Sequence, residues 1–310
     1  MANADYDLVI IGGGPAGLTA GLYAARAKLN VLLLEKVAIG GQILSTDWIE
    51  NYPGFPEGLS GSQLIEKMEQ QARNFGLKIE NELVISTDFS NRIKAIKLNG
   101  KTITAYSVII ATGASPSKIG IPGEDIFFGK GVSFCATCDA PFYKNRIVAA
   151  VGGGDTAVQE SIYLTKFAKK VYLIHRRDKL RAVPLLQERA FANDKIEFIW
   201  DSVVTDIKGG LTNVEKIIVK NLKTNESREL FVDGCFIWVG IRPNTEFLTK
   251  EVKLDQNGFI SVNSNMETTV AGVYAVGDVR NTPLRQVVTA AGDAAIAAFS
   301  AQHYIESINK

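Results

Sequence analysis

A glycine-rich turn between an apolar run and a helix is the feature that most restricts how this chain folds. The run YDLVII leads into GGGPAG at 12–17, and an Ala- and Leu-rich stretch of helical character continues to about Leu29. A second predicted strand, over 30–34, then ends at Glu35. Two runs of strand length around a helix, with glycines at the first junction, predict a complete β-α-β unit.

The residue types in this unit indicate a dinucleotide site. Gly12, Gly14 and Gly17 permit a tight turn and the close approach of a pyrophosphate to the N-terminus of the helix. Glu35, at the end of the second strand, can accept hydrogen bonds from ribose hydroxyls. Because the glycines follow a strand, open a helix and have this acid at the expected distance, we prefer nucleotide binding to a purely structural turn.

The same arrangement is repeated from residue 146 onward. The sequence RIVAAVGGGDTAVQE contains Gly152-x-Gly154-x-x-Ala157, and an apolar run over 170–174 forms the second predicted strand. This duplication predicts a second dinucleotide-binding unit of the same kind.

The two units differ at the position that contacts the ribose. Counted from the first glycine of each unit, His175 replaces Glu35, and Arg176, Arg177 and Arg181 follow it. An acid repels a 2′-phosphate, whereas arginine binds phosphate bidentately, so the first unit suits FAD and the second suits NADPH. A solvated basic start of a helix is the alternative for the second unit.

Chain length and turn-rich segments predict two domains. The 310 residues, 46% of them hydrophobic, exceed the size at which a single core stops growing. The sequence ASPSKIGIPGED is typical of a crossing between domains. The final segment is too short for a further domain of this size and most economically completes the first. We therefore expect an α/β protein with two Rossmann-like domains of the three-layer ββα type: a discontinuous FAD domain over 1–115 and 244–310, and an inserted NADPH domain over 116–243.

Charge and hydropathy argue against nucleic-acid and membrane partners. The formal net charge is +1, from 34 basic and 33 acidic side chains, and the basic residues form no long tract. No apolar stretch is long enough to span a bilayer, and the first apolar run is short for a signal peptide. We expect a cytoplasmic protein.

Two of the three cysteines form a Cys-x-x-Cys pair, Cys135 and Cys138, within FCATCDAP. Zinc takes four ligands, and the other candidates, Cys235, His175 and His303, are scattered, so we expect no metal site. A disulfide across two intervening residues adds little stability, whereas such pairs often hold a reactive thiolate. Redox exchange is the favoured interpretation, and Cys235 is interpreted as a small buried apolar residue.

Asp139 directly follows the pair. It could act as a general acid toward a leaving thiolate or a reduced flavin. The alternative is a helix-start cap beside Pro141.

The motifs taken together are specific. GGGPAG, GGQ, ATGA, CATCD, GGGDTA, HRRDKLRA, GVYAVGD and RQVVTAAGDA occur in this order along the chain. In these motifs and their spacing the sequence resembles, from end to end, the low-molecular-weight bacterial or archaeal-type thioredoxin reductases of the class II pyridine nucleotide-disulfide oxidoreductase family. Glutathione-reductase-type enzymes instead carry their redox pair in the FAD domain and have a long C-terminal dimerisation domain.

The resemblance implies which residues contact FAD. Glu35 would bind the adenosine ribose, Asp278 the ribityl chain, and the helix starting at about Gln286 would direct its positive end at the flavin. An Asx turn remains the alternative for Asp278, and loop hydrogen bonds to the backbone for Gln42 and Asn51. The implied FAD set is Gly12, Gly14, Pro15, Ala16, Gly17, Glu35, Gly41, Gln42, Asn51, Ala111, Thr112, Gly113, Gly277, Asp278, Arg285, Gln286 and Val287. The implied NADPH set is Gly152, Gly154, Asp155, Thr156, Ala157, His175, Arg176, Arg177 and Arg181.

The activity implied by the resemblance is NADPH-dependent reduction of thioredoxin by a homodimeric flavoprotein. Electrons would pass from NADPH to FAD, to the Cys135–Cys138 disulfide and to oxidised thioredoxin, with Cys138 facing the flavin, Cys135 attacking the partner and Asp139 as the acid. Because the nicotinamide and the pair would share one face of the flavin, a domain rotation with hinges at 115–123 and 240–245 is implied. A glutaredoxin-like or peroxiredoxin-system partner, a ferredoxin-fed reductase and a non-catalytic FAD-binding scaffold are the alternatives.

Overall fold

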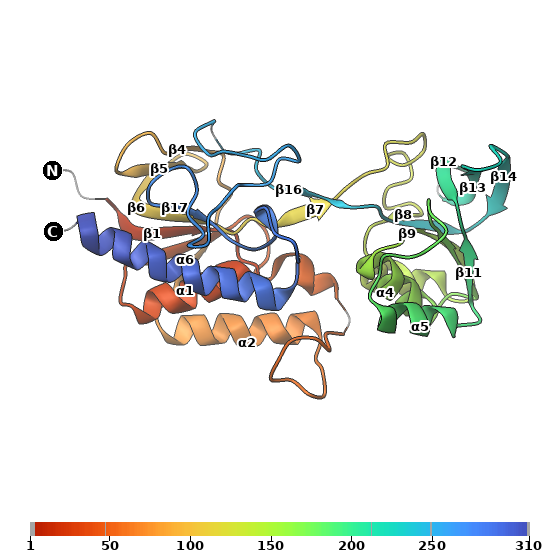
Figure 1. Ribbon diagram of the computed structural model, residues 1–310, viewed down its shortest axis with the longest axis horizontal. Helices are drawn as coiled ribbons and strands as arrows, with labels where there is room; N and C mark the ends of the chain where they lie inside the picture. The colour runs from red at the N-terminus through yellow and green to blue at the C-terminus, as the bar shows by residue number, and fades with distance from the viewer. Residues whose placement is uncertain (1–3, 47, 212, 249, 309–310) are drawn as a thin grey trace. The chain divides into compact units, whose positions relative to one another are not determined.

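The computed structural model describes residues 4–46, 48–211, 213–248 and 250–308. The chain divides into two compact units (Figure 1). The first comprises Met1–Ser115 and Arg242–Lys310, and the second comprises Pro116–Ile241.

The first unit is built on a sheet with the strand order β3-β2-β1-β6-β5-β4, in which β17 also pairs with β6. Strand β1 lies parallel to both β2 and β6, whereas β5 runs antiparallel to β6. The strands are β1 (Tyr6–Ile11), β2 (Val31–Glu35), β3 (Lys78–Asn81), β4 (Ser86–Asp88), β5 (Lys94–Lys97), β6 (Thr102–Ile110) and β17 (Val273–Ala275).

Both faces of this sheet are covered, which explains the unbroken apolar runs in its central strands. In β1, Leu8 and Ile10 point into a core shared with the helices, whereas Val9 and Ile11 point into a second core on the opposite face. The helices on the first face are α1 (Pro15–Arg26), α2 (Gly61–Asn74) and α6 (Val287–Ile308) (Figure 1). A short helical turn, η1 (Gly41–Ser45), precedes α2.

The C-terminal part of the chain is integral to this first sheet. Val273 and Ala275 of β17 pair with Val108 and Ile110 of β6. The Ser107 hydroxyl donates a hydrogen bond of 2.8 Å to the Gly272 carbonyl, and α6 packs against α1. The first and last segments of the chain therefore share one core.

The second unit repeats the plan on a smaller scale. Its main sheet has the order β11-β10-β9-β15-β8, with parallel pairing throughout, and a three-stranded antiparallel sheet, β12-β13-β14, is also present. The main strands are β8 (Val132–Ser133), β9 (Ile147–Gly152), β10 (Lys170–Ile174), β11 (Ile196–Ile199) and β15 (Gly234–Trp238). The antiparallel strands are β12 (Ser202–Gly209), β13 (Val214–Asn221) and β14 (Ser227–Phe231). The helical segments are α3 (Ala136–Asp139), η2 (Ala140–Tyr143), α4 (Asp155–Leu164) and α5 (Pro184–Phe191).

Both units are Rossmann-type, so the predicted α/β class is confirmed. The sequence also predicts a helix from about Gly61 to Phe75, and the structure has this helix as α2, which ends at Asn74. It begins with a capping box in which Ser60 accepts a hydrogen bond from the Gln63 backbone and Gln63 accepts one from the Ser60 backbone.

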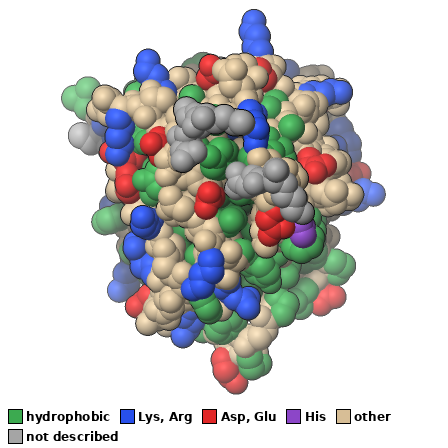
Figure 2. All heavy atoms as spheres, turned by 90° about the vertical axis from the view of Figure 1, so that its left-hand side faces the viewer, with side chains coloured by type: hydrophobic (Ala, Val, Ile, Leu, Met, Phe, Trp, Pro, Cys, Tyr) green, Lys and Arg blue, Asp and Glu red, His purple; other side chains and the backbone are tan. Residues whose placement is uncertain are grey.

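The surface carries charges of both signs. On the face in Figure 2, Lys and Arg side chains are interspersed with Asp and Glu side chains, and apolar side chains lie between them. Over the part of the chain that the structure describes, no helix is both long enough and apolar enough to cross a membrane.

Asn244 joins two distant segments of the first unit, after a short two-stranded sheet of β7 (Ala114–Pro116) and β16 (Ile241–Pro243). Its side-chain amide donates a 2.8 Å hydrogen bond to the Thr112 carbonyl, and its Oδ1 accepts one of 2.7 Å from the Ser115 hydroxyl. Its backbone N–H donates to the Gly113 carbonyl.

Replacing this side chain will measurably weaken the first unit. We expect Asn244→Ala to lower the free energy of unfolding by about 2 kcal/mol, because it leaves two half-buried polar partners without their hydrogen bonds. Urea denaturation followed by circular dichroism measures the change, with the exposed Asn265→Ala as the control. Equal unfolding free energies for the two variants would contradict this role for Asn244.

Candidate functional site

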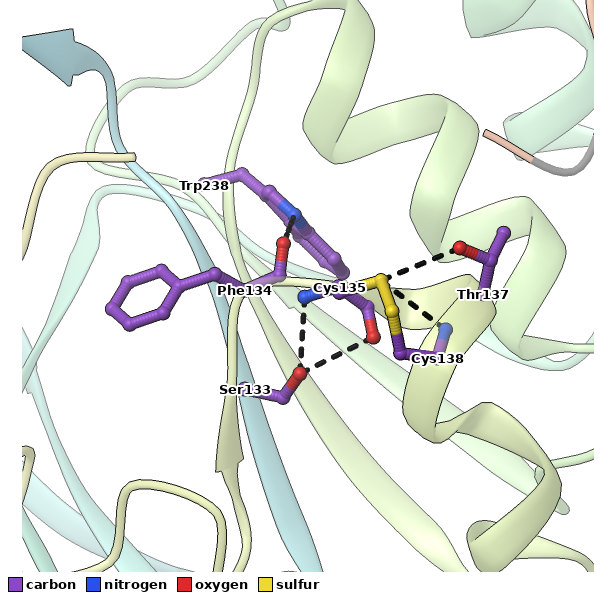
Figure 3. Close-up of a disulfide and its surroundings, with 6 residues drawn as sticks. All are labelled: Ser133, Phe134, Cys135, Thr137, Cys138 and Trp238. Carbon is purple, nitrogen blue, oxygen red and sulfur yellow. Dashed lines mark hydrogen bonds between the residues drawn. A yellow bond between two sulfur atoms is a disulfide. The ribbon is translucent and has the colours of Figure 1, made fainter. Parts of the chain in front are cut away.

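The Cys135 and Cys138 side chains form a disulfide at the start of α3, with Cα atoms 5.4 Å apart (Figure 3). Cys135 is the N-cap residue of α3, and its Sγ accepts a hydrogen bond of 3.2 Å from the Cys138 backbone N–H. The Thr137 hydroxyl lies 3.4 Å from the same sulfur. Donors directed at Sγ of Cys135 favour its thiolate form once the disulfide is opened.

Two side chains that the sequence analysis missed fix the backbone before the pair. The buried Ser133 hydroxyl accepts a 3.0 Å hydrogen bond from the Cys135 N–H. The Trp238 indole N–H donates one of 3.0 Å to the Phe134 carbonyl, as Figure 3 shows. The Trp238 contact carries no sequence signal, because its partner lies 104 residues away along the chain. The Ser133 contact is local, two residues apart, but a serine at the end of an apolar run does not by itself indicate this role.

The two cysteines differ in their surroundings. Cys138 is exposed, whereas Cys135 and Asp139 are half-buried. Asp139 lies at the boundary of α3 and η2 and makes no side-chain capping bond to η2, so the cap hypothesis for this residue is wrong. Burial, with a further contribution from the Asp139 carboxylate, raises the pKa of the nearby Tyr143 to about 12. Asp139 therefore stands beside a phenol that stays protonated at neutral pH.

Cys235 is free and fully buried in β15, which confirms its interpretation as a small apolar residue. Burial, and then the nearby Glu124 carboxylate, raise the pKa of its thiol to about 12. Within the described ranges, His, Cys, Asp and Glu side chains form no group of three or more that could hold a metal ion.

The first glycine loop is shaped by backbone contacts that exclude side chains. Gly12 has a φ of +109°, and a Cβ on it would lie 2.4 Å from the Ala111 carbonyl oxygen. A Cβ on Gly17 would lie 1.8 Å from the Gly12 carbonyl oxygen. These two glycines let β1 turn directly into α1.

Other predicted loop residues face open space. A Cβ on Gly14 would approach no atom closer than 3.8 Å, and one on Gly41 no atom closer than 3.6 Å. The nearest atom to that Gly41 position is the Gly14 Cα, so the loop and the GGQ segment lie together. Helix α1 begins with Pro15 and has no side-chain cap at its N-cap, Gly14. Uncapped N–H groups beside open glycines can hold a phosphate.

Glu35 lies at this loop, as predicted. Its Oε2 accepts a hydrogen bond of 2.8 Å from the Gly13 N–H, and its Oε1 accepts one of 3.1 Å from the Val37 N–H. Each carboxylate oxygen retains a further lone pair, so Glu35 can also accept a bond from a ribose hydroxyl.

A third set of the predicted FAD-binding residues lies between the end of β17 and the start of α6. Asp278 lies in the short turn η3 (Gly277–Val279), and among the described residues no donor reaches its carboxylate, so the Asx-turn hypothesis is wrong. Burial raises the pKa of Asp278 above its ordinary value, the Arg285 guanidinium opposes this rise, and the Asp293 carboxylate adds to it. Arg285 lies over the Phe259 ring, and its buried Nε lacks a partner in the described part of the molecule.

The start of α6 brings two further predicted residues together. Asn51 donates a 2.9 Å hydrogen bond to Oε1 of Gln286, so the Asn51 amide contacts a side chain rather than the backbone. The predicted helix start at about Gln286 is close to the observed first residue, Val287. Gln42 is exposed in η1, and Ala111, Thr112 and Gly113 follow β6 at the same edge of the sheet.

The second glycine loop repeats the first with one change. A Cβ on Gly152, whose φ is +152°, would lie 2.4 Å from the Trp238 carbonyl oxygen and 2.5 Å from Cβ of Ala157. Gly154 has open space on its Cβ side and is the N-cap residue of α4. Asp155 Oδ1 accepts a 2.8 Å hydrogen bond from the Val183 N–H, and Thr156 is exposed.

The basic cluster lies next to this loop. Arg176, Arg177 and Arg181 are exposed, and the Arg181 N–H donates a 2.7 Å hydrogen bond to the Gly153 carbonyl. His175, by contrast, is 4% exposed and packs beneath Gly153, where a Cβ would lie 2.4 Å from its ring. Burial and then the three arginines lower the pKa of His175, so its ring is neutral at pH 7.

Comparisons with known proteins agree with this geometry. The family described as pyridine nucleotide-disulphide oxidoreductase matches residues 6–294. A thioredoxin reductase of Peptoclostridium acidaminophilum is 48% identical over 309 residues, covering 97% of this chain and 98% of that protein. The crystal structure of a Lactococcus lactis thioredoxin reductase matches with a TM-score of 0.96 at 43% identity, covering 98% of this chain and 100% of that chain. One from T. acidophilum matches with a TM-score of 0.92 at 36% identity, covering 99% and 100%.

The different states of the three cysteines predict a thiol titration. With 5,5′-dithiobis(2-nitrobenzoate) at neutral pH, the native oxidised protein will release no colour, because Cys135 and Cys138 are bonded and Cys235 is buried as a thiol of raised pKa. Prior mild reduction will expose the pair, and only denaturation will add Cys235. A fast-reacting thiol in the native oxidised protein would contradict this assignment.

Proposed function

The chain belongs to the pyridine nucleotide-disulphide oxidoreductase family, and from this premise we propose that it is a thioredoxin-disulfide reductase. Electrons pass from NADPH through FAD and the Cys135–Cys138 disulfide to oxidised thioredoxin. The observation that carries the proposal is the disulfide itself, which lies in the same unit as the second glycine loop and its arginines. A ferredoxin-fed reductase is not favoured, because such an enzyme has no use for a basic cluster at a nucleotide loop.

The first unit offers the residues that FAD requires. Open space at Gly14 and Gly41 leaves room for a pyrophosphate. The Asp278 carboxylate, which has no partner among the described residues, can accept a hydrogen bond from a hydroxyl of the ribityl chain. Ala111, Thr112 and Gly113 follow β6 at the same edge of the sheet, and Asn51 contacts Gln286 beside the start of α6, which supports their proposed roles. Bound FAD supplies the two-electron chemistry that couples hydride transfer from NADPH to disulfide reduction.

The second unit offers a site for NADPH. Gly154 presents the uncapped start of α4 to a pyrophosphate, and Arg176, Arg177 and Arg181 can hold the 2′-phosphate by bidentate hydrogen bonds. His175 supports Gly153 from below as a neutral ring rather than adding a charge. This arrangement favours NADPH over NADH.

The cysteine pair carries out thiol–disulfide exchange. Two electrons and two protons convert the disulfide into two thiols as the S–S bond breaks. The Cys135 thiolate, stabilised by the Cys138 N–H, then attacks the thioredoxin disulfide to form a mixed disulfide. The Cys138 thiolate displaces the partner, which leaves as a dithiol, and the Cys135–Cys138 bond is restored. Asp139, adjacent in sequence and half-buried, is the acid that protonates the leaving thioredoxin thiolate.

We further propose that the enzyme is a cytoplasmic homodimer with no nucleic-acid or membrane partner. The near-zero net charge gives no electrostatic basis for nucleic-acid binding. The proposed domains are an FAD domain over 1–115 and 244–310 and an NADPH domain over 116–243, and the division into compact units at 115 and 241 supports this proposal.

Removing the cysteine that faces the flavin separates the two half-reactions. NADPH will still bleach the flavin absorbance of Cys138→Ser, because hydride transfer does not involve the pair, but thioredoxin-dependent insulin reduction will fall by about 10³ or more. Cys235→Ala is the matched control and will keep wild-type turnover, since that thiol is buried. Insulin reduction that survives in Cys138→Ser would remove the pair from the electron path.

Removing the arginines will change the choice of nucleotide. In Arg176→Ala/Arg177→Ala, KM for NADPH will rise by about tenfold or more, because charge-assisted hydrogen bonds to the phosphate are lost, while KM for NADH changes little. Steady-state assays with both nucleotides measure the ratio, and Lys179→Ala, another exposed cation of the same turn, is the control. An equal loss with NADPH and NADH would contradict a 2′-phosphate site here.

A further inference from the structure

A buried ion pair joins the η3 turn to helix α6. Arg280 donates from Nε to Oδ2 of Asp293 at 2.7 Å and from Nη2 to Oδ1 at 2.6 Å, a bidentate fork. The side chains are only 14% and 10% exposed. Asp293 Oδ2 also accepts a 3.1 Å hydrogen bond from the Gly277 N–H. One carboxylate on α6 thus contacts both the first residue of η3 and the residue that follows the turn.

Such a pair is poorly explained by stability alone. Removing two charges from water is costly, and a buried ion pair often contributes no more to folding than apolar side chains of similar volume. Its geometric specificity is high, because a planar guanidinium accepts a carboxylate in one orientation. The pair is therefore better suited to fixing a position than to adding stability.

The element that the pair fixes carries the proposed ribityl contact. Asp278 lies between Gly277 and Arg280, the two residues bound by Asp293. Gly277 has a φ of +69°, and a Cβ on it would lie 3.2 Å from Cβ of Ala16 and 3.4 Å from Cβ of Ala290. The turn is thus wedged between the starts of α1 and α6, the two helices whose N-termini belong to the proposed FAD site.

We propose that Arg280 and Asp293 are positioning residues for FAD, which hold η3 against α6 so that Asp278 and the start of α6 keep a fixed spacing. This inference rests on the proposed function, because it assigns a role within the proposed FAD site. The pair also balances charge at the site. Asp293 and Arg285 are the charged groups that act on Asp278, and Arg280 pairs with the Asp293 carboxylate.

A comparison of single and double variants separates positioning from stability. Asp293→Asn keeps an acceptor for the Gly277 N–H but leaves Arg280 buried without its counter-ion. Arg280→Met leaves the Asp293 carboxylate buried without its counter-ion. Both single variants will lower the melting temperature of the apoprotein and weaken FAD binding. Arg280→Met/Asp293→Asn leaves no unpaired charge, so its apoprotein will melt within a few degrees of wild type.

FAD binding by the double variant decides between a positioning role and a purely stabilising role of the pair. Its FAD dissociation constant, measured by titrating apoprotein with FAD and following the quenching of flavin fluorescence, will remain about tenfold or more above wild type. The visible absorption bands and the midpoint potential of its bound flavin will also shift, because the ring is held less firmly. Glu69→Gln, which removes an exposed ion pair of α2 in the same unit, is the control and will match wild type in all three measurements.

The outcomes distinguish this inference from the proposed function. A double variant that binds FAD as tightly as wild type, with the same spectrum and potential, would overturn the positioning role and leave the reductase assignment intact. A wild-type apoprotein that binds no FAD would overturn both.

Discussion

The close approach of backbone at the strand-to-helix turn is the constraint on which each unit depends. At the first loop, the Gly12 carbonyl occupies the space where a side chain on Gly17 would lie. At the second loop, the Ala157 Cβ and the Trp238 carbonyl occupy the space where a side chain on Gly152 would lie. This contact brings the start of a helix directly over the end of a central parallel strand. All other proposed binding residues are then arranged around that edge, because the parallel strands of the sheet end on the same side.

The sequence predicts a structural feature correctly where the interactions that determine this feature join residues close together along the chain. The β-α-β units, helix α2 and the buried state of Cys235 follow from residue spacing and hydrophobicity over short stretches. The redox interpretation of the cysteine pair likewise depended on a short spacing and on the scarcity of other ligands. In each case the residues that decide the outcome are neighbours along the chain.

Prediction failed where the partner lies far away in sequence. Trp238 binds the Phe134 carbonyl, Asn244 contacts Thr112, and Arg280 with Asp293 fixes a turn, yet none of these contacts has a local pattern. The helix cap and the Asx turn, which were the alternatives to the functional roles of Asp139 and Asp278, are local contacts that these residues do not make in the described part of the chain. His175 aligned correctly with Glu35, but its burial beneath Gly153 depends on the packing of the loop.

The contribution of β17 and α6 to the first sheet has a consequence for synthesis on the ribosome. The first unit lacks a strand and its longest helix until the last part of the chain has emerged, whereas Pro116–Ile241 is contiguous and can form its core as soon as it leaves the exit tunnel. The second unit can therefore complete its core before the first, which departs from the usual N-to-C order. In the interval, the side of α1 that packs against α6 is without this partner, although α2 and the first strands are already present.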